Sequence, residues 1–434
     1  MKNYYLNDLL SYLNNAPTPW HAVEEACQRL SKHGYTELKE NEKWELKLGH
    51  SYYIKHHQTT LCVFTLPKNS PTRVRLLASH TDSPGFKLKP QAEIRRHSMI
   101  LLGVEIYGSP LLNSWLNRDL GIAGHIIYKN KNNQPENCLV QLDSFPVVIP
   151  QLAIHLDREV NEKGLLLNKQ EHLNALAALE KDIPTGQTYL ETILKKQIDF
   201  QELLTFDLFL YPLDKARFVG FENQFISSYR IDSLASVHAA LSALIETATP
   251  LENDIKMAIF WNHEEVGSHT SQGAESPFFH QTLERILLNL NCSKEDFFRL
   301  LNQSHCTSID LAHALHPNYL DKHDGMHQPK LGQGVIIKNN AQQRYASTAT
   351  SSIPIHLAAG IEQIPLQHFV SRNDMPCGST IGPLQACTAG ISTVDIGCGE
   401  LSMHSCRELM ASEDYIHLLN LLKVILKMPD WPII

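Results

Sequence analysis

Short apolar segments separated by polar turns run along both ends of the chain, and their spacing predicts alternating strands and helices. Apolar positions recur at helical spacing in residues 6–14 and 20–32, and Gly34 is placed to end the second helix. Apolar runs of strand length occur at 52–55, 61–66, 74–79, 257–261 and 391–396. One helix is predicted to follow the segment 230–235 and to run to about residue 247, and another is predicted at 417–426. These segments predict an α/β fold.

The pattern changes between residues 95 and 224. Short β-rich segments alternate there with polar loops, and one helical segment is predicted at 187–204. We therefore predict a mixed-sheet α/β domain formed by residues 1–94 and 225–434, with a smaller β-rich domain inserted at 95–224. The irregular, His- and Pro-rich segment 316–329 is long enough to cover a site, although a surface loop explains it equally well.

Composition and charge exclude several classes of protein. The 434 residues are 43% hydrophobic and 19% charged, which is typical of a globular enzyme. A net charge of -8 argues against nucleic acid or an anionic membrane as partner. The first residues lack an apolar signal core, and no apolar run is long enough to span a bilayer. Nine cysteines without a CxxC pair favour reduced thiols, so we expect a cytoplasmic protein.

The most informative residues are the adjacent acids Glu264 and Glu265, which follow the apolar strand predicted at 257–261. Two acids at the end of a buried strand are costly unless a cation or a proton compensates them. One could ligate a metal while the other transfers a proton. An isolated acid pair is more often a solvated helix start, so the pair alone does not decide between these alternatives.

Other segments carry single histidines or acids, each ambiguous alone. His80 ends an apolar strand, and Asp82 is placed to accept its other ring N–H. Taken alone, Asp232 and Asp310 are better explained as helix caps, and His404 as a hydrogen-bonded core histidine. Together with the acid pair they supply the ligand and base residue types that a two-metal hydrolytic centre needs. The mixed nitrogen and oxygen donors suit Zn²⁺, Mn²⁺ or Co²⁺ without choosing between them.

The motifs around these residues resemble, in order, those of the aspartyl aminopeptidase family of dinuclear zinc metallopeptidases. They read HTDSPGFKLKP, RIDSLAS, NHEEVGS, SIDLAHALHPNY, VIIKNNAQQRY, MPCGSTIGP and LSMHSCRE. The resemblance extends from about residue 15 to 415. It implies a dizinc-exopeptidase fold for the catalytic domain and a role in dimerisation for the inserted domain.

The resemblance also implies two divalent metal ions per subunit, with Zn²⁺ favoured over Mn²⁺ and Co²⁺. The implied ligands are His80 and Asp310 at one ion, Asp232 as the bridge, and Glu265 and His404 at the other. Glu264 resembles the general base, and Asp82 the acid that orients His80.

A substrate pocket is implied in the same way. Lys338, Tyr345, Met375 and Gly378 would shape a pocket for an acidic first residue, and His155 would be contributed to a neighbouring subunit's site. From residue type alone, Lys338 would be an exposed lysine at the end of a strand.

The expected function is hydrolysis of an N-terminal Asp or Glu from peptides, by a water that two metals activate and with Glu264 as general base. The alternatives are a broad-specificity neutral aminopeptidase, a dinuclear deacylase, or a non-enzymatic shell protein with a degenerate peptidase fold. Retention of all five implied ligands and the base disfavours the last. The resemblance further implies a homo-oligomer, typically a dodecamer built from dimers.

Overall fold

The chain forms two compact units in a computed structural model, which describes residues 2–428. The first unit comprises the residues up to Asp82, Ala216–Met403 and the residues from Glu408 on. The second unit comprises Ser83–Lys215 and His404–Arg407. The division into folding domains at 94/95 and 224/225 stays a prediction; the compact units change at 82/83 and 215/216.

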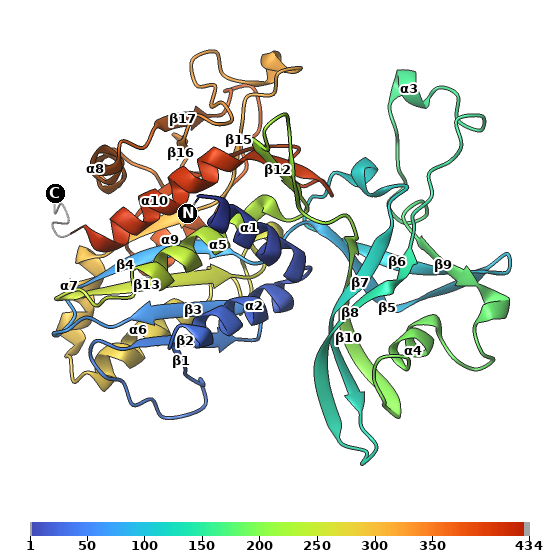
Figure 1. Ribbon diagram of the computed structural model, residues 1–434, viewed down its shortest axis with the longest axis horizontal. Helices are drawn as coiled ribbons and strands as arrows, with labels where there is room; N and C mark the ends of the chain where they lie inside the picture. Colours follow the sequence, from blue (N-terminus) through green and yellow to red (C-terminus); the bar gives the residue numbers. More distant parts are fainter. Residues whose placement is uncertain (1, 429–434) are drawn as a thin grey trace. The chain divides into compact units, whose positions relative to one another are not determined.

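A nine-stranded mixed sheet forms the centre of the first unit. Its order is β1 (Thr36–Glu37), β2 (Ser51–His56), β3 (Thr60–Thr65), β13 (Asp254–Trp261), β4 (Arg73–His80), β14 (His305–Ile309), β18 (Ser392–Gly397), β16 (Val335–Asn339) and β17 (Leu366–Val370) (Figure 1). Strands β13, β4, β14 and β18 run parallel to one another. Their carboxyl ends therefore meet at one edge, where open α/β sheets bind ligands.

Helices cover both faces of this sheet. One face packs against α1 (Lys2–Asn15), α2 (Pro19–Lys32), α5 (Ile231–Glu246), α8 (Ile353–Glu362) and α10 (Ser412–Lys427). The other packs against α6 (Phe278–Asn289), α7 (Lys294–Gln303) and α9 (Ile381–Ala389). Strand β13 contributes Ala258 and Phe260 to the first core, and Met257, Ile259 and Trp261 to the second. Burial on both faces explains why the central strands are continuous apolar runs.

A second, five-stranded sheet completes the first unit. Its order is β11 (Arg217–Val219), β12 (Phe225–Ser228), β20 (Glu408–Ala411), β19 (Gly399–Leu401) and β15 (Ala312–His313). Strands β15 and β19 follow β14 and β18 directly along the chain. The small sheet therefore begins where the parallel strands end.

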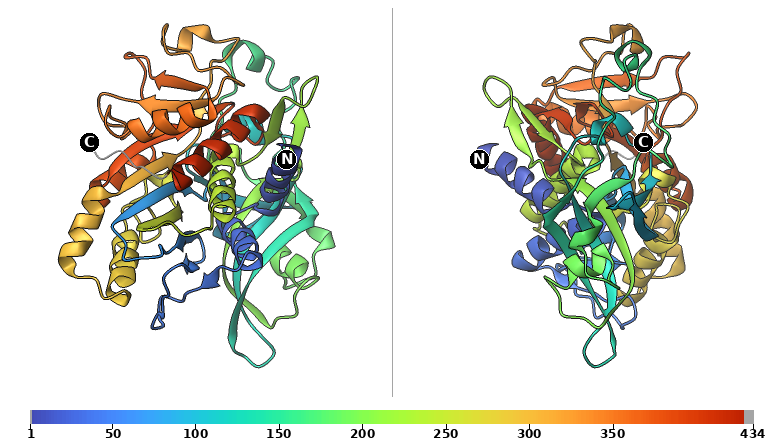
Figure 2. Two further views of the ribbon diagram at one scale, coloured as in Figure 1. Left: turned by 60° about the vertical axis from the view of Figure 1, so that its left-hand side comes forward. Right: turned by 90° about the vertical axis from the view of Figure 1, so that its right-hand side faces the viewer.

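The second unit is built on a six-stranded antiparallel sheet. Its order is β8 (Pro135–Val147), β7 (Leu120–Lys129), β10 (Glu202–Pro212), β5 (Gly85–Arg96), β6 (Met99–Tyr107) and β9 (Ala175–Leu179), and Figure 2 shows this sheet strongly curled. Short helical pieces accompany it: α3 (Val160–Lys163), α4 (Tyr189–Leu194), η1 (Leu112–Trp115) and η2 (Glu180–Asp182). The predicted fold class, an α/β unit with a smaller β-rich part, is confirmed.

The helix predicted at 187–204 is wrong beyond residue 194. Thr188 and Glu191 form a capping box that starts α4, and the helix ends at Leu194. From Glu202 the chain is strand β10, paired antiparallel with β7. The leucines and lysines between residues 194 and 204 give neither a clear helical nor a clear strand period, so the sequence did not mark where the helix ends.

The other predicted elements agree with the structure. Gly34 follows α2 with φ +80°, the left-handed conformation of a helix C-terminus. The segment 316–329 is irregular apart from η4 (Leu320–Lys322). Within residues 2–428, no helix combines the length and apolar character needed to cross a membrane.

A partly buried ion cluster joins three helices of the first unit. Asp8 Oδ2 lies 2.7 Å from a terminal nitrogen of Arg29 and 3.0 Å from His238 Nε2. Burial raises the pKa of Asp8, but the hydrogen bonds and charges of His238 and Arg29 outweigh it and lower the pKa to about 2. The ionised carboxylate therefore stabilises the fold above the unfolded-state pKa, and this contribution is lost as pH falls through the folded-state pKa.

Asp8→Asn is expected to lower the free energy of unfolding at pH 7 by roughly 1–2 kcal/mol. The difference from wild type should shrink as the pH falls below about 4. Asp8 then takes up a proton in the unfolded state, so the ionised carboxylate stabilises the fold progressively less. Urea unfolding at several pH values measures both effects. Glu25→Gln is the matched control, since Glu25 meets the same Arg29 from within its own helix, 3.0 Å away. A difference that is constant with pH would contradict this account.

Candidate metal centre

Three neighbouring parallel strands end at the same level and deliver the candidate residues to one edge of the sheet. His80 is the last residue of β4 and pairs in register with Trp261, the last residue of β13. Ser308 of β14 pairs with Ala78 of β4, so Asp310 follows at the same edge. His80 and Asp310, 230 positions apart in the sequence, thus become neighbours.

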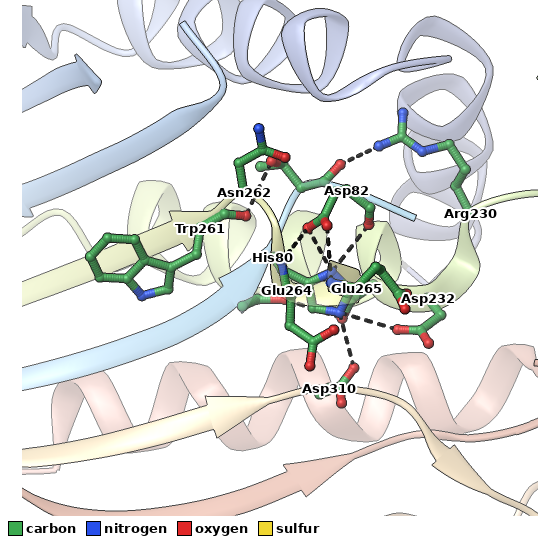
Figure 3. A network of polar contacts seen from close by, with 12 residues as sticks. His80, Asp82, Arg230, Asp232, Trp261, Asn262, Glu264, Glu265 and Asp310 are labelled. Atoms are coloured by element: carbon green, nitrogen blue, oxygen red, sulfur yellow. Dashed lines mark hydrogen bonds and ion pairs between the residues drawn. The ribbon is translucent and has the colours of Figure 1, made fainter. Parts of the chain in front are cut away.

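The two nitrogens of the buried His80 ring face different groups (Figure 3). Nε2 lies 3.4 Å from Asp232 Oδ1 and 3.3 Å from Asp310 Oδ1. Nδ1 lies 3.1 Å from the Asp82 carbonyl oxygen and 3.4 Å from its Oδ1. A tautomer that donates Nδ1–H to Asp82 leaves Nε2 to bind a metal, as in other metal sites. Burial acts to lower the pKa of His80, but hydrogen bonds to the three carboxylates raise it well above its ordinary value.

Two groups of potential ligand atoms share this histidine. The ligand atoms of His80, Asp232 and Asp310 lie within 4.8 Å of one another, and so do those of His80, Glu264 and Glu265. So many carboxylates in a largely buried site repel one another unless a cation compensates them. The donors are one imidazole nitrogen and carboxylate oxygens, which suit Zn²⁺ and similar divalent ions. These residues therefore fit a divalent metal ion.

Asp82 also fixes the backbone that carries the acid pair. Its Oδ1 accepts the N–H of Glu264 at 3.2 Å, and its Oδ2 accepts the N–H of Glu265 at 3.1 Å. The turn that follows β13 forms the short helix η3 (Glu264–Val266) and closes at Gly267 with φ +97°. Asp82 thus connects the segment that follows β4 to the turn that follows β13.

Glu264 has the properties of a proton acceptor that works near neutral pH. Burial raises its pKa to about 8; the charge of His80 opposes this shift, and Asp310, Asp82 and Asp232 add to it. A group whose pKa is close to the working pH is best suited to general acid–base catalysis.

Two supporting residues were missed by the sequence reasoning. The buried guanidinium of Arg230 donates to the carbonyl oxygens of Ala16 and Thr81, which anchors the backbone beside His80. Glu408 Oε2 accepts the N–H of Asp232 at 3.1 Å. Both are charged residues within a few positions of a predicted ligand, and that proximity is the signal that could have found them.

Two predicted site residues belong to the second unit. His404 opens the segment His404–Arg407, and its Nδ1 lies 3.1 Å from the carbonyl oxygen of Ser109. His155 is exposed in the loop that follows β8. Their roles as metal ligand and as a residue contributed to another subunit stay predictions.

Lys338 is buried, in contrast to the exposed lysine expected from its residue type. Its Nζ donates to Asp310 Oδ2 at 3.0 Å and to the Leu311 carbonyl at 2.6 Å. The ring of the buried Tyr345 has its centre 5.3 Å from the same nitrogen. Lys338 therefore holds one oxygen of Asp310 while the other faces His80.

The two remaining pocket residues lie on the loop after β17. Met375 is partly exposed and lines a cavity of about 340 Å³ together with several residues of the 316–329 segment. Gly378 is exposed and is not among the residues that line this cavity. The irregular segment 316–329 thus forms part of a cavity wall.

Known proteins resemble this chain over nearly its whole length. Residues 12–425 match the family model of aminopeptidase I zinc metalloproteases, M18. A probable M18 family aminopeptidase 2 of Clostridium novyi is 39% identical over 431 residues, covering 98% of this chain and 99% of that protein. The corresponding protein of Ectopseudomonas mendocina is also 39% identical, over 100% of both chains.

Solved structures agree with the sequence matches. The structure described as the Ape4 and Nbr1 complex has a TM-score of 0.94 at 31% identity, covering 99% of this chain and 86% of that one. The mApe1 dodecamer of S. cerevisiae has a TM-score of 0.86 at 25% identity, covering 98% and 97%.

Proposed function

Because the chain belongs to the M18 family of zinc aminopeptidases, we propose that it removes an N-terminal Asp or Glu from peptides at a centre of two divalent metal ions. The activity class, a metal-dependent aminopeptidase, follows from the family; the substrate preference and the mechanism are the proposal. The observation that carries it is the convergence of His80, Asp232 and Asp310 beside the Glu264–Glu265 pair.

The five ligands would be His80 and Asp310 at one ion, Asp232 between the two, and Glu265 and His404 at the other, with Zn²⁺ as the favoured metal. Bound ions would supply Lewis-acid chemistry that polarises the scissile carbonyl and makes water more acidic. Asp82 would keep His80 in the tautomer that presents Nε2 and hold the backbone of the acid pair.

Glu264 would act first as base and then as acid. It accepts a proton from the water whose oxygen attacks the carbonyl carbon of the first residue. When the carbon–nitrogen bond breaks, Glu264 donates the proton to the leaving amino group of the second residue. Its raised pKa supports this role, because the same group must hold and release a proton near neutral pH.

Lys338 would provide the acidic preference. Two of its three N–H groups are directed to Asp310 and to the Leu311 carbonyl, and the third would meet the carboxylate of the substrate side chain. A lysine acts as a point charge without a fixed fork geometry, so it can accept either Asp or Glu.

The experiment that tests the proposal compares hydrolysis of Asp-, Glu-, Leu- and Ala-substrates by wild type and by Lys338→Met. We expect kcat/KM on the acidic substrates to fall roughly 10- to 100-fold, the size of a charge-assisted hydrogen bond, and to change little on Leu. Bound zinc is measured in parallel, since Lys338 also contacts Asp310. An equal loss on all four substrates, with zinc retained, would reject the specificity role.

One observation favours a broad-specificity neutral aminopeptidase as the second candidate. The Lys338 ammonium already has a carboxylate partner in Asp310, so its charge is partly neutralised without substrate. In that case the wild-type enzyme should prefer Leu or Ala over Asp. Activity on N-acylated amino acids, which lack a free amino group, would instead indicate a dinuclear deacylase.

We also propose that the protein is a cytoplasmic homo-oligomer, a dodecamer built from dimers. The yeast relative supports this, since its structure is described as a dodecamer. The loop of the second unit that carries His155 exposes Leu152, Ile154 and Leu156, at 58%, 45% and 74%. Three exposed apolar side chains in one loop are typical of a surface that contacts another protein.

A further inference from the structure

Asp395, in β18, is a fully buried acid to which the proposed mechanism gives no role, since its side chain is 0% exposed. Its neighbours Val394 and Ile396 belong to the core on the α5, α8 and α10 side of the sheet, so alternation along the strand directs Asp395 to the opposite face. Ile337 of β16 lies in the same core and pairs with Ile396. Lys338, the next residue, therefore faces the same side of the sheet as Asp395.

The two carboxylate oxygens of Asp395 bind two different segments. Oδ2 accepts the N–H of Ala346 at 2.6 Å, and Oδ1 accepts the hydroxyl of Thr380 at 2.7 Å. The backbone N–H of Asp395 donates to Ser347 Oγ at 3.0 Å. Burial raises the pKa of Asp395, whereas the charge of Lys338 and the donated hydrogen bonds act in the opposite direction. Asp395 is thus held between the two segments, close enough to Lys338 to sense its charge.

These segments are the loops that carry the predicted pocket residues. Neither loop forms a helix or a strand. The first, residues 340–352 after β16, carries Tyr345, whose ring centre lies 5.3 Å from Lys338 Nζ. The second, residues 371–380 after β17, carries the two others, Met375 and Gly378. Loops without regular backbone pairing depend on such side-chain contacts for a fixed position.

The first turn of α9 leaves room for this carboxylate. A Cβ atom at Gly382 would lie 2.3 Å from Oδ2 and 2.4 Å from Oδ1 of Asp395. Thr380, the cap of α9, accepts the N–H of Gly382 with the same hydroxyl that it donates to Asp395. A larger residue at 382 would therefore push the carboxylate away from its donors. This close approach explains a glycine inside a helix, where glycine is otherwise unfavourable.

We propose that Asp395 is a positioning residue of the substrate pocket, which holds the two loops around Lys338 and so sets the preference for an acidic first residue. This inference rests on the specificity proposed above. Lys338 Nζ itself donates to Asp310 and to the Leu311 carbonyl. Asp395 therefore acts through the loops, since a displaced Tyr345 would change the space beside the ammonium that a substrate carboxylate must enter.

The test compares wild type with Asp395→Asn and Thr380→Val at matched zinc occupancy. The amide keeps the size of the side chain but accepts through only one atom, so one donor loses its partner. We expect KM for an Asp-substrate to rise and the ratio of kcat/KM on Asp- over Leu-substrates to fall roughly 10-fold, the size of one buried hydrogen bond. Thr380→Val releases only the second loop and should lower the ratio roughly 3-fold. Bound zinc and kcat on the Leu-substrate should not change.

Thr393→Val is the matched control for Thr380→Val. Thr393 is as buried as Thr380, lies two residues before Asp395 in β18, and donates to the Ile391 carbonyl at 2.9 Å. It holds neither loop, so the substrate ratio should stay at the wild-type value. Gly382→Ala gives a test that leaves the carboxylate chemistry intact: the added Cβ should displace Asp395 and lower the ratio. It and Thr380→Val carry the test even where Asp395→Asn folds poorly.

A double-mutant cycle with Lys338→Met separates positioning from general support of the fold. If Asp395 acts through the pocket, adding Asp395→Asn to Lys338→Met should lower the substrate ratio no further, because the preference it would remove is already lost. Equal losses on Asp- and Leu-substrates, an unchanged ratio in all three pocket variants, or a further loss of the same size in the double variant would overturn the proposal. Failure of the proposed specificity is distinguishable, since wild type itself would then prefer Leu over Asp.

Discussion

Glu264→Gln is expected to lower kcat roughly 10²- to 10⁴-fold, the usual contribution of a general acid–base group. The amide cannot accept the proton of the attacking water, but it preserves the size of the side chain. KM should change little, since the substrate would still be held by the metal ions and the pocket. Steady-state kinetics with the preferred aminoacyl substrate, at matched zinc occupancy, measures the effect.

The neighbouring acid provides the matched control for this variant. Glu265→Gln makes the same chemical change one position later, at a residue we assign to metal binding. It should lose zinc, whereas Glu264→Gln should retain it. Substantial activity in zinc-loaded Glu264→Gln would refute the assignment of the base.

Asp232→Ala is expected to produce the second large effect, loss of both zinc binding and activity. Asp232 lies 3.4 Å from His80 and would serve both ions, so its removal should weaken the whole centre. Zinc content should fall from about two ions per subunit to one or none, and kcat/KM should fall at least roughly 10³-fold. Elemental analysis after gel filtration, beside kinetics in added zinc, measures both quantities.

Glu408→Gln is the matched control for Asp232→Ala, because it leaves the proposed ligand in place and changes only the residue that holds its backbone. Glu408 accepts the backbone N–H of Asp232 and is not a proposed ligand. Its variant should weaken zinc roughly 10- to 100-fold, as mutations of groups that hold ligands commonly do, and excess zinc should restore activity. Retention of both ions by Asp232→Ala would contradict the bridging assignment.

The central sheet and the location of the site were predictable because their signals are local. A strand buried on both faces, such as β13, is a continuous apolar run, and acids that follow such runs are conspicuous. Parallel strands then bring their carboxyl ends to one edge, which is why His80, Asp310 and the acid pair meet. The helix predicted at 187–204 failed because leucines and lysines give no clear period there.

The environment of individual side chains was less predictable, because it depends on residues distant in sequence. Lys338 can be buried because its ammonium group donates to Asp310 and to the Leu311 carbonyl, which follow a different strand, β14. The role of Arg230 likewise depends on carbonyl groups of residues 16 and 81.

The most direct measurement is diffraction from crystals of the zinc-loaded protein, with anomalous data on both sides of the zinc absorption edge. We predict two zinc peaks about 3.5–4 Å apart, one beside His80 and Asp310, the other beside Glu265, with Asp232 between them. A single peak, or two peaks away from Asp232, would contradict the two-metal account.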